Sequence, residues 1–267
     1  MSERVCIGID GHVATVMLNR ADKKNAVDHA MFDALIGAGE KLAQNPAVRA
    51  VVVHGSGNNF CAGIDLSVFQ GEGVAPAGGG RLLPREHSPA NFFQSAAYVW
   101  RELPVPVIAA IEGYALGAGL QIALGADIRL AAPDAQLSVM EIKWGIIPDM
   151  AISATLRDVM PVDRIKELAF TGRIVDGRAA AELGLVTRVE DDPLAAAMAL
   201  AADVAARSPQ AIRAIKRLVN EGWREPEAAS LKLEAGLQGS LLGSPNQVEA
   251  VMANRHKKKP AFRDPGP

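Results

Sequence analysis

Strand-like and helix-like spacings of apolar residues alternate along the first two-thirds of the chain. Apolar and polar residues alternate on both sides of Asp10-Gly11, which predicts a β-hairpin. Helical spacing follows over Met31–Leu42. Short apolar runs with turn residues around them predict the strands Arg49–Val53, Val105–Ile111, Asp127–Ala131 and Ala135–Val139. Alternating strands and helices are typical of an α/β fold.

The last third of the chain has a different pattern. From Pro193 onward, apolar residues recur at helical spacing, and Ser208-Pro209 and Ser244-Pro245 are typical helix starts. We therefore expect an α/β core over residues 1–195 and a helical region over residues 196–267. A helical end of this kind suits packing against a neighbouring subunit. Between the core elements, the Gly- and Pro-rich segment Gln70–Ala90 predicts a mobile loop that gates a site or varies in length.

Two glycine-bearing turns follow predicted strands. The first glycine turn is Phe60–Leu66, and the second is Gly113–Gly119, which leads into an apolar helical segment. Such turns expose backbone N–H groups, which can hold a developing negative charge. Together the two turns could form an oxyanion hole.

The second glycine turn has two other possible interpretations. A dinucleotide-binding loop needs a small residue at position 122, and this position is Ile122, which argues against that class. A turn that only reverses the chain is compatible with the residues and stays open.

Composition and charge narrow the function classes further. The 267 residues carry a formal net charge of −2, which offers no electrostatic case for binding nucleic acid or a membrane. Two cysteines fit a reducing compartment, and no His or Cys cluster has metal-ligand spacing, so we expect no metal. The N-terminus has no signal pattern, and Glu112 and glycines interrupt the most apolar run. We expect a cytoplasmic protein.

The motifs together resemble the enoyl-CoA hydratase/isomerase (crotonase) superfamily. This resemblance implies a spiral of ββα units, a helical C-terminal trimerisation region, an acyl-CoA thioester substrate and no separate cofactor. The partners that it implies are copies of the same chain, as a homotrimer or a dimer of trimers. The segments that carry it are Asn19-Arg20, Phe60–Leu66, Pro106–Ala131, Glu141–Pro148, Leu168–Val189 and Lys258–Phe262.

The resemblance assigns the oxyanion hole to the backbone N–H groups of Ile64 and Ala118. Removal of a proton next to a thioester leaves an enolate whose charge collects on the carbonyl oxygen. One preorganised donor at that oxygen contributes on the order of 100- to 1000-fold in rate. Because the donors are backbone groups, the side chains at these positions matter little, provided that neither is proline.

The acid–base residues depart from the hydratase pattern. Hydratases of the family carry two glutamates; the second is present as Glu141, but Gln121 replaces the first. An amide can orient a water but cannot exchange a proton with it. Asp149 stands where hydratases commonly have glycine, which is similar to the dienoyl-CoA isomerase branch, although that branch has an aspartate at the position of Gln121. We expect double-bond isomerisation; 2-enoyl-CoA hydration and a catalytically silent acyl-CoA-binding protein stay open.

Structural roles are also possible for these residues. Asp149 precedes an apolar segment and could be a helix N-cap. Gln121 could be a helix residue satisfied by its neighbours. Glu141 lies between apolar residues, where an unpaired charge is costly, which favours a functional role.

The CoA moiety has its own expected contacts. The resemblance implies contacts from Lys23 or Lys24 and from Ala62, and from the C-terminal Lys259 and Phe262, often across a subunit boundary. Exposed surface charge is the alternative reading of each lysine.

Overall fold

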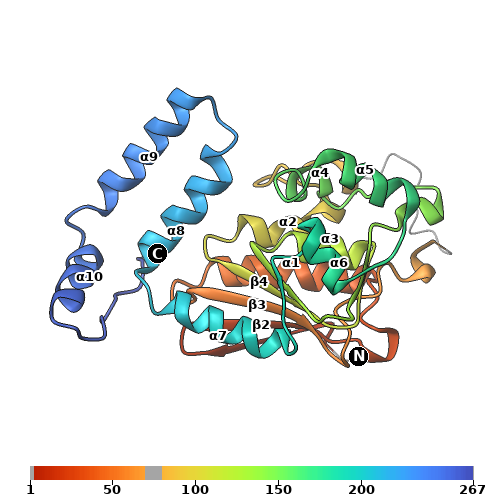
Figure 1. The fold of residues 1–267 in the computed structure, drawn as a ribbon, viewed down its shortest axis with the longest axis horizontal. Helices are drawn as coiled ribbons and strands as arrows, with labels where there is room; N and C mark the ends of the chain where they lie inside the picture. Colours follow the sequence, from red (N-terminus) through yellow and green to blue (C-terminus); the bar gives the residue numbers. More distant parts are fainter. Residues whose placement is uncertain (1–2, 70–79, 267) are drawn as a thin grey trace.

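A six-stranded sheet forms the centre of the molecule (Figure 1). The computed structural model describes residues 3–69 and 80–266. The predicted hairpin is confirmed, because the first two strands pair antiparallel across Gly11, while every other neighbouring pair in this sheet is parallel. In spatial order the strands are β1 (Val5–Asp10), β2 (Val13–Leu18), β3 (Ala50–Gly55), β4 (Val107–Ile111), β6 (Ile128–Ala131) and β9 (Arg188–Val189).

Helices cover both faces of this sheet. Along β3, Val51 and Val53 pack with the apolar residues of one face, and Ala50 and Val52 pack with those of the other, because successive strand side chains point to opposite faces. The first face is covered by α1 (His29–Ala43), α2 (Phe92–Glu102) and α3 (Ala118–Leu124). The second face is covered by α7 (Pro193–Ala205). A sheet covered on both faces agrees with the apolar runs in its parallel strands.

A smaller sheet lies next to the carboxyl end of β4. It contains β5 (Tyr114–Leu116), β7 (Gln136–Ser138) and β8 (Val175–Asp176) in that order. Gly113, with φ +55°, separates β4 from β5, so the chain leaves one sheet and enters the other within a few residues. The helix α6 (Gly177–Leu183) packs on this sheet, whereas α4 (Ile152–Thr155) packs on α3 and α5 (Val162–Thr171) packs on the 3-10 helix Glu141–Trp144.

The C-terminal helices project from the core as an arm (Figure 1). The arm consists of α8 (Pro209–Arg217), a π-helical turn (Leu218–Gly222), α9 (Glu227–Leu241) and α10 (Pro245–Arg255). The expected division between residues 195 and 196 falls inside α7, whose small residues pack on the sheet. The structure therefore places the start of the arm later, at α8. None of the described helices is both long and apolar enough to cross a membrane.

Two basic side chains fasten the arm and the tail to the core. The Lys216 ammonium, on α8, donates to the carbonyls of Trp100 and Val105 at 3.0 and 2.9 Å and lies 2.8 Å from the Asp127 carboxylate. Arg49, next to the start of β3, donates to the Phe262 carbonyl at 3.0 Å and pairs with the Asp264 carboxylate of the C-terminal tail. These buried cations are compensated by hydrogen bonds, as buried charge requires.

Some local elements differ from the pattern-based predictions. Helix α2 was not predicted, although Asn91 and Gln94 form a capping box at its start. The apolar segment after Asp149 forms only the short α4. Of the expected loop at 70–90, residues 70–79 lie outside the described residues, and the rest contains a 3-10 helix (Gly80–Leu82) and an isolated bridge between Arg85 and Ser88.

Candidate active site

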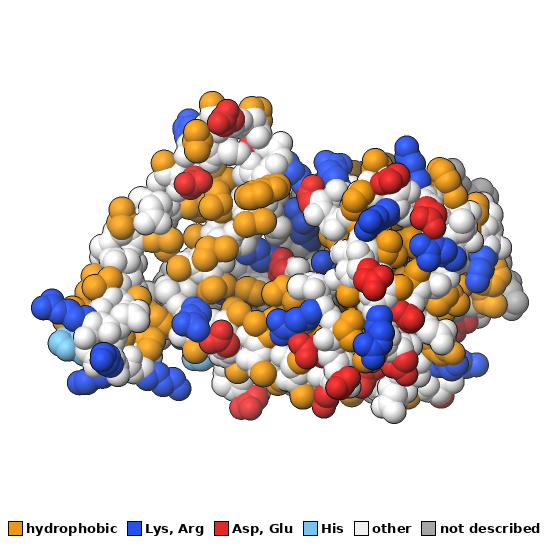
Figure 2. Space-filling view, viewed as in Figure 1, with side chains coloured by type: hydrophobic (Ala, Val, Ile, Leu, Met, Phe, Trp, Pro, Cys, Tyr) orange, Lys and Arg blue, Asp and Glu red, His pale blue; other side chains and the backbone are white. Residues whose placement is uncertain are grey.

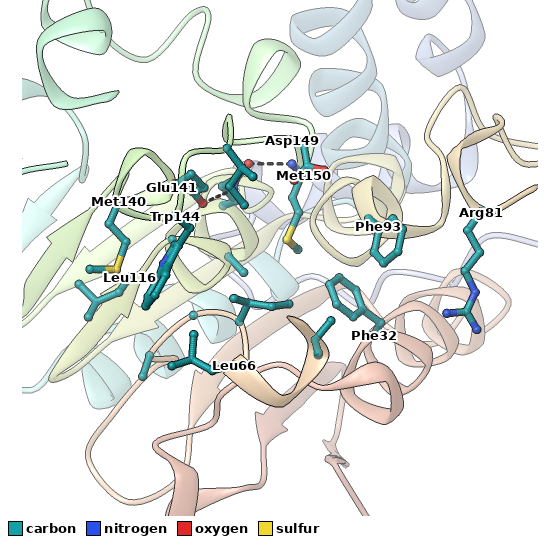
Figure 3. Close-up of a pocket in the computed structure, with 18 of the residues that line it drawn as sticks. Phe32, Leu66, Arg81, Phe93, Leu116, Met140, Glu141, Trp144, Asp149 and Met150 are labelled. Carbon is teal, nitrogen blue, oxygen red and sulfur yellow. Dashed lines mark hydrogen bonds between the residues drawn. The ribbon is translucent and has the colours of Figure 1, made fainter. Parts of the chain in front are cut away.

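A pocket of about 470 Å³ lies where both glycine turns meet the segment after β7. Two carboxylic acids, Glu141 and Asp149, and the amide of Gln121 open into it (Figure 3). Most of the wall is apolar, formed by Phe32, Ile64, Leu66, Val68, Leu82, Phe93, Leu116, Ala118, Met140, Trp144, Ile146 and Met150. An apolar pocket with a few converging polar groups is typical of a small-molecule site.

The first glycine turn leaves one backbone N–H, that of Ile64, outside the hydrogen bonds that hold the turn. The Val27 N–H donates to the Gly63 carbonyl at 2.8 Å, and the Asp65 N–H donates to the Val27 carbonyl at 2.9 Å. In such a parallel bridge the residue between the two partners, here Ile64, has its own N–H on the opposite side. Ile64 itself lines the pocket.

The second glycine turn presents a similar group. Ala118 is the first residue of α3, and the N–H groups of a first helical turn have no intrahelical acceptor. In the part of the chain that the structure describes, neither the Ala118 N–H nor the Ile64 N–H donates to another group. Each follows a glycine with positive φ, +51° at Gly117 and +100° at Gly63. The two donors predicted from the resemblance thus line one pocket.

The backbones of the two turns touch each other. The Leu116 N–H donates to the Cys61 carbonyl at 3.0 Å. A Cβ atom at Gly63 would lie 2.8 Å from the Leu116 carbonyl oxygen, and one at Gly119 would lie 2.3 Å from the Cys61 carbonyl oxygen. Only glycine permits this approach.

An ion pair that the sequence analysis did not assign holds the first turn. Arg20 Nη1 donates to Asp65 Oδ2 at 2.6 Å and to the Ala26 carbonyl at 2.9 Å. The other Asp65 oxygen accepts a hydrogen bond from the N–H of Ser67, which lies in the 3-10 helix Leu66–Phe69. Together the Ser67 N–H and the Arg20 guanidinium lower the pKa of Asp65 to about 2. Asp65 therefore anchors the residue next to Ile64.

Gln121 is engaged at both ends of its side-chain amide. Its Nε2 donates to Glu141 Oε1 at 2.6 Å, and its Oε1 accepts from the Met150 N–H at 2.8 Å (Figure 3). Because the Met150 N–H can only donate, the amide oxygen must face it, and the NH₂ group must face Glu141. Both ends of the Gln121 amide are thus satisfied by neighbouring groups, and these groups belong to the pocket or adjoin it.

Glu141 has one oxygen held and one oxygen without a partner. It starts a 3-10 helix (Glu141–Trp144), its side chain is only 6% exposed, and within the described residues its Oε2 is buried with no hydrogen-bond partner. Burial raises the pKa of this carboxyl, and the nearby Asp149 charge raises it further, while the hydrogen bond from Gln121 opposes the shift. A buried oxygen without a hydrogen-bond partner is unusual in a folded protein. Transfer of a proton between this oxygen and a substrate would account for it.

Asp149 does not cap a helix. Helix α4 begins after Ala151, which has φ +66°, and no side chain caps it. Asp149 instead lines the pocket and is more exposed than Glu141. Partial desolvation still raises the pKa of its carboxyl. Two carboxyls with raised pKa values in one pocket are typical of proton-transfer sites.

The residues expected to contact CoA lie in two separate parts of the structure. The Lys24 ammonium lies over the Tyr114 ring, 4.4 Å from its centroid, and the Lys24 carbonyl accepts from the N–H of Ala62, which lines the pocket. Lys23 is exposed beside them. Lys259 and Phe262 lie on the C-terminal tail and do not line the pocket of their own chain.

The described residues also bear on two other kinds of chemistry, metal binding and nucleophilic catalysis by cysteine. Among the described residues there is no group of three or more His, Cys, Asp or Glu that could hold a metal ion. Burial raises the pKa of the Cys61 thiol to about 12, so this cysteine is not a nucleophile at neutral pH.

The raised pKa of Glu141 predicts a pH-dependent stability difference. The folded-state pKa lies above the unfolded value of about 4.3, so ionisation of Glu141 destabilises the folded protein as pH rises through this window. Glu141→Gln keeps the shape without the charge. Thermal unfolding should therefore show a higher midpoint for Glu141→Gln at pH 8 and no gain near pH 4. The exposed Glu182→Gln is the control; an equal rise there, or none in Glu141→Gln, contradicts the analysis.

The sequence and the fold were compared with known proteins. The family described as Enoyl-CoA hydratase/isomerase matches residues 8–265. The chain is 30% identical over 268 residues to a probable enoyl-CoA hydratase of Bacillus subtilis, covering 97% of this chain and 98% of that one. It is 32% identical over 254 residues to the mitochondrial Delta(3,5)-Delta(2,4)-dienoyl-CoA isomerase of Homo sapiens, covering 93% and 77%.

Solved structures agree with the sequence comparison. The crystal structure of a putative enoyl-CoA hydratase/isomerase from Mycobacterium abscessus superposes with a TM-score of 0.88 at 32% identity, over 98% of this chain and all of the other. An enoyl-CoA hydratase from Bacillus anthracis gives a TM-score of 0.86 at 27% identity, over 97% and 98%. The crotonase fold expected from the resemblance is therefore confirmed, and the chain is an enzyme that belongs to the enoyl-CoA hydratase/isomerase family.

Proposed function

We propose that this enzyme shifts a carbon–carbon double bond in an unsaturated acyl-CoA, with Glu141 and Asp149 as its two proton carriers. The observation that carries the proposal is the pair of carboxyls with raised pKa values in one pocket. Gln121 holds one oxygen of Glu141, which leaves Oε2 as the atom that can take or give a proton.

The thioester carbonyl would accept hydrogen bonds from the N–H groups of Ile64 and Ala118. When a base removes a proton from the carbon next to this carbonyl, the electron pair delocalises onto the oxygen. Preorganised donors in a water-poor pocket stabilise this charge without reorganisation at the moment of reaction. The free N–H groups that follow Gly63 and Gly117 support this role.

The two carboxyls would divide the proton transfers. One of the two carboxyls, in its ionised form, removes the proton next to the thioester, and the other, in its protonated form, returns one to a carbon further along the conjugated chain. The double bond moves, and no atom is added or lost. Each carboxyl ends in the opposite protonation state, and exchange with solvent restores both. The greater exposure of Asp149 supports this exchange.

Hydration of a 2-enoyl-CoA is the second candidate, because relatives such as the Bacillus subtilis protein are named as probable hydratases. In that reaction a water must be held and must lose a proton. The Gln121 amide cannot exchange a proton, and both of its ends already bond to protein groups. Hydration would therefore leave the proton transfers to Glu141, with or without Asp149.

Asp149→Asn separates the two reactions. We expect isomerisation to fall by about 100-fold or more, the usual contribution of a general acid or base, and any hydration to fall much less. The measurement is turnover of 2-enoyl-, 3-enoyl- and 3,5-dienoyl-CoA substrates with chromatographic analysis of products. Asp163→Asn, at an exposed aspartate on α5, is the control, and Glu141→Gln should abolish every proton transfer.

Other outcomes would contradict the proposal in distinct ways. If the wild-type enzyme hydrates crotonyl-CoA at roughly 1 to 1000 per second and leaves dienoyl substrates unchanged, it is a hydratase. If it binds acyl-CoA but converts none of these substrates, it is a catalytically silent member of the family.

The oxyanion role has its own test. Ile64→Pro or Ala118→Pro removes one N–H and should lower turnover by about 100-fold or more, whereas Ile64→Val and Ala118→Gly retain the N–H and should stay active. Circular dichroism establishes that each variant folds. Equal losses in all four folded variants would argue against backbone donors.

We also propose that the chain assembles through the arm into a homotrimer or a dimer of trimers. Figure 2 shows apolar side chains gathered over the projecting helices. The exposed ones include Ile215, Val219, Trp223, Leu231, Leu242, Val248, Val251 and Met252. Large exposed apolar patches mark interaction sites. Assembly would also allow Lys259 and Phe262 of one chain to reach the CoA bound to another.

Sedimentation velocity tests the assembly. We expect a particle of three or six chains of 28.1 kDa, and a shift toward monomer in Trp223→Glu, since this tryptophan is 75% exposed and a charge there would be desolvated in an interface. A monomeric wild-type protein at micromolar concentration would contradict the proposal.

A further inference from the structure

A single cation lies among the pocket-lining residues in the described part of the chain. Arg81, on the 3-10 helix Gly80–Leu82, is the only lysine or arginine there. Figure 3 shows its side chain beside Phe32 and Phe93, at the end of the pocket away from Leu116 and Met140. The acidic groups of the site, Glu141 and Asp149, lie on the other side of these rings.

Contacts with two side chains hold Arg81, and neither contact neutralises it. Its guanidinium carbon lies 4.9 Å from the centroid of the Phe92 ring, and Nη1 lies 3.3 Å from His29 Nδ1. Within the described residues, Arg81 takes part in no ion pair, whereas the nearby Arg85 pairs with Glu40. The charge is thus oriented by stacking on an aromatic ring and has no carboxylate partner there.

The rings next to Arg81 form a close-packed end of the pocket. The centroids of Phe92 and Phe93 lie 5.3 Å apart, and the Phe32 centroid lies 5.8 Å from Phe92 and 5.4 Å from Phe93. Two of these pairs are edge-to-face and the Phe32–Phe92 pair is tilted, and such arrangements are favourable. Arg81 therefore stacks on one member of a packed aromatic cluster.

The opposite end of the pocket is the one suited to CoA. Lys24 lies over Tyr114, which precedes Leu116 by two positions on β5, and its carbonyl contacts the N–H of Ala62. If the CoA of the proposed substrate binds on this side, as the contacts expected from Lys24 and Ala62 imply, the acyl chain extends past Glu141 toward Arg81. The group that meets Arg81 is then the far end of the acyl chain.

We propose that Arg81 binds a negatively charged group, most simply a carboxylate, at the far end of the acyl chain, so that the preferred substrates are ω-carboxyacyl thioesters of CoA. A methyl end would displace water from the guanidinium and offer no hydrogen bond in return. A carboxylate would accept charge-assisted hydrogen bonds from the planar guanidinium, in a geometry that lysine does not reproduce. The inference rests on the proposed orientation of the acyl-CoA.

Binding of unreactive ligands tests this inference separately from catalysis. Isothermal titration calorimetry would compare saturated ω-carboxyacyl-CoA thioesters, from succinyl to suberyl, with fatty acyl-CoA thioesters of the same carbon number. For at least one chain length, the wild-type enzyme should bind the carboxylated member on the order of 10-fold more tightly, the lower end of the range for a hydrogen bond to a charged group, because Arg81 is exposed to solvent before binding.

Two arginine variants complete the experiment. Arg81→Gln should remove this preference and leave fatty acyl-CoA affinity unchanged within about threefold, whereas Arg85→Gln, on the same segment but outside the pocket, should keep it. A wild-type enzyme without the preference, or an Arg81→Gln variant that keeps it, overturns the inference.

Two further outcomes identify the reason for a failure. If Arg81→Gln weakens free CoA as much as every thioester, the anion at Arg81 is a CoA phosphate, and the inference is wrong. If the wild-type enzyme binds no acyl-CoA at all, the proposed function fails together with the inference that rests on it.

Discussion

The site depends on a contact between two pieces of backbone. Gly63 and Gly119 allow the two glycine turns to approach to distances at which any side chain would clash with a carbonyl oxygen. The hydrogen bond from Leu116 to Cys61 fixes their relative position. This contact sets the positions of the Ile64 and Ala118 N–H groups relative to each other. The geometry of these donors is therefore determined by the main chain and is insensitive to the side chains that surround the pocket.

The polar groups of the pocket depend in turn on one buried amide. Gln121 connects the 3-10 helix that starts at Glu141 with the backbone at Met150. It therefore sets the rotamer of the first carboxyl and the position of the segment that carries the second, Asp149. Supporting residues of this kind hold functional groups within the small tolerances that catalysis needs.

Local patterns predicted much of the fold and part of the site. The hairpin, α1 and the strands β3, β4, β6 and β7 follow from the spacing of apolar residues, and the two glycine turns follow from their composition. The short edge strand β9 was not predicted. Helix α2 was missed although its capping box is visible in the sequence. The interactions of Gln121 and Arg20 could not be predicted, because their partners Met150 and Asp65 come close only through the folding of distant segments.

The double engagement of Gln121 also has a consequence for substitution at this position. A change to glutamate would keep the acceptor for the Met150 N–H but would place a second carboxylate oxygen against Glu141. Like charges at hydrogen-bond distance cannot both be ionised, and one carboxyl would stay protonated. A glutamate at this position would therefore share one proton with Glu141, so that a single Gln121→Glu substitution would not by itself add a second ionised carboxylate to the site.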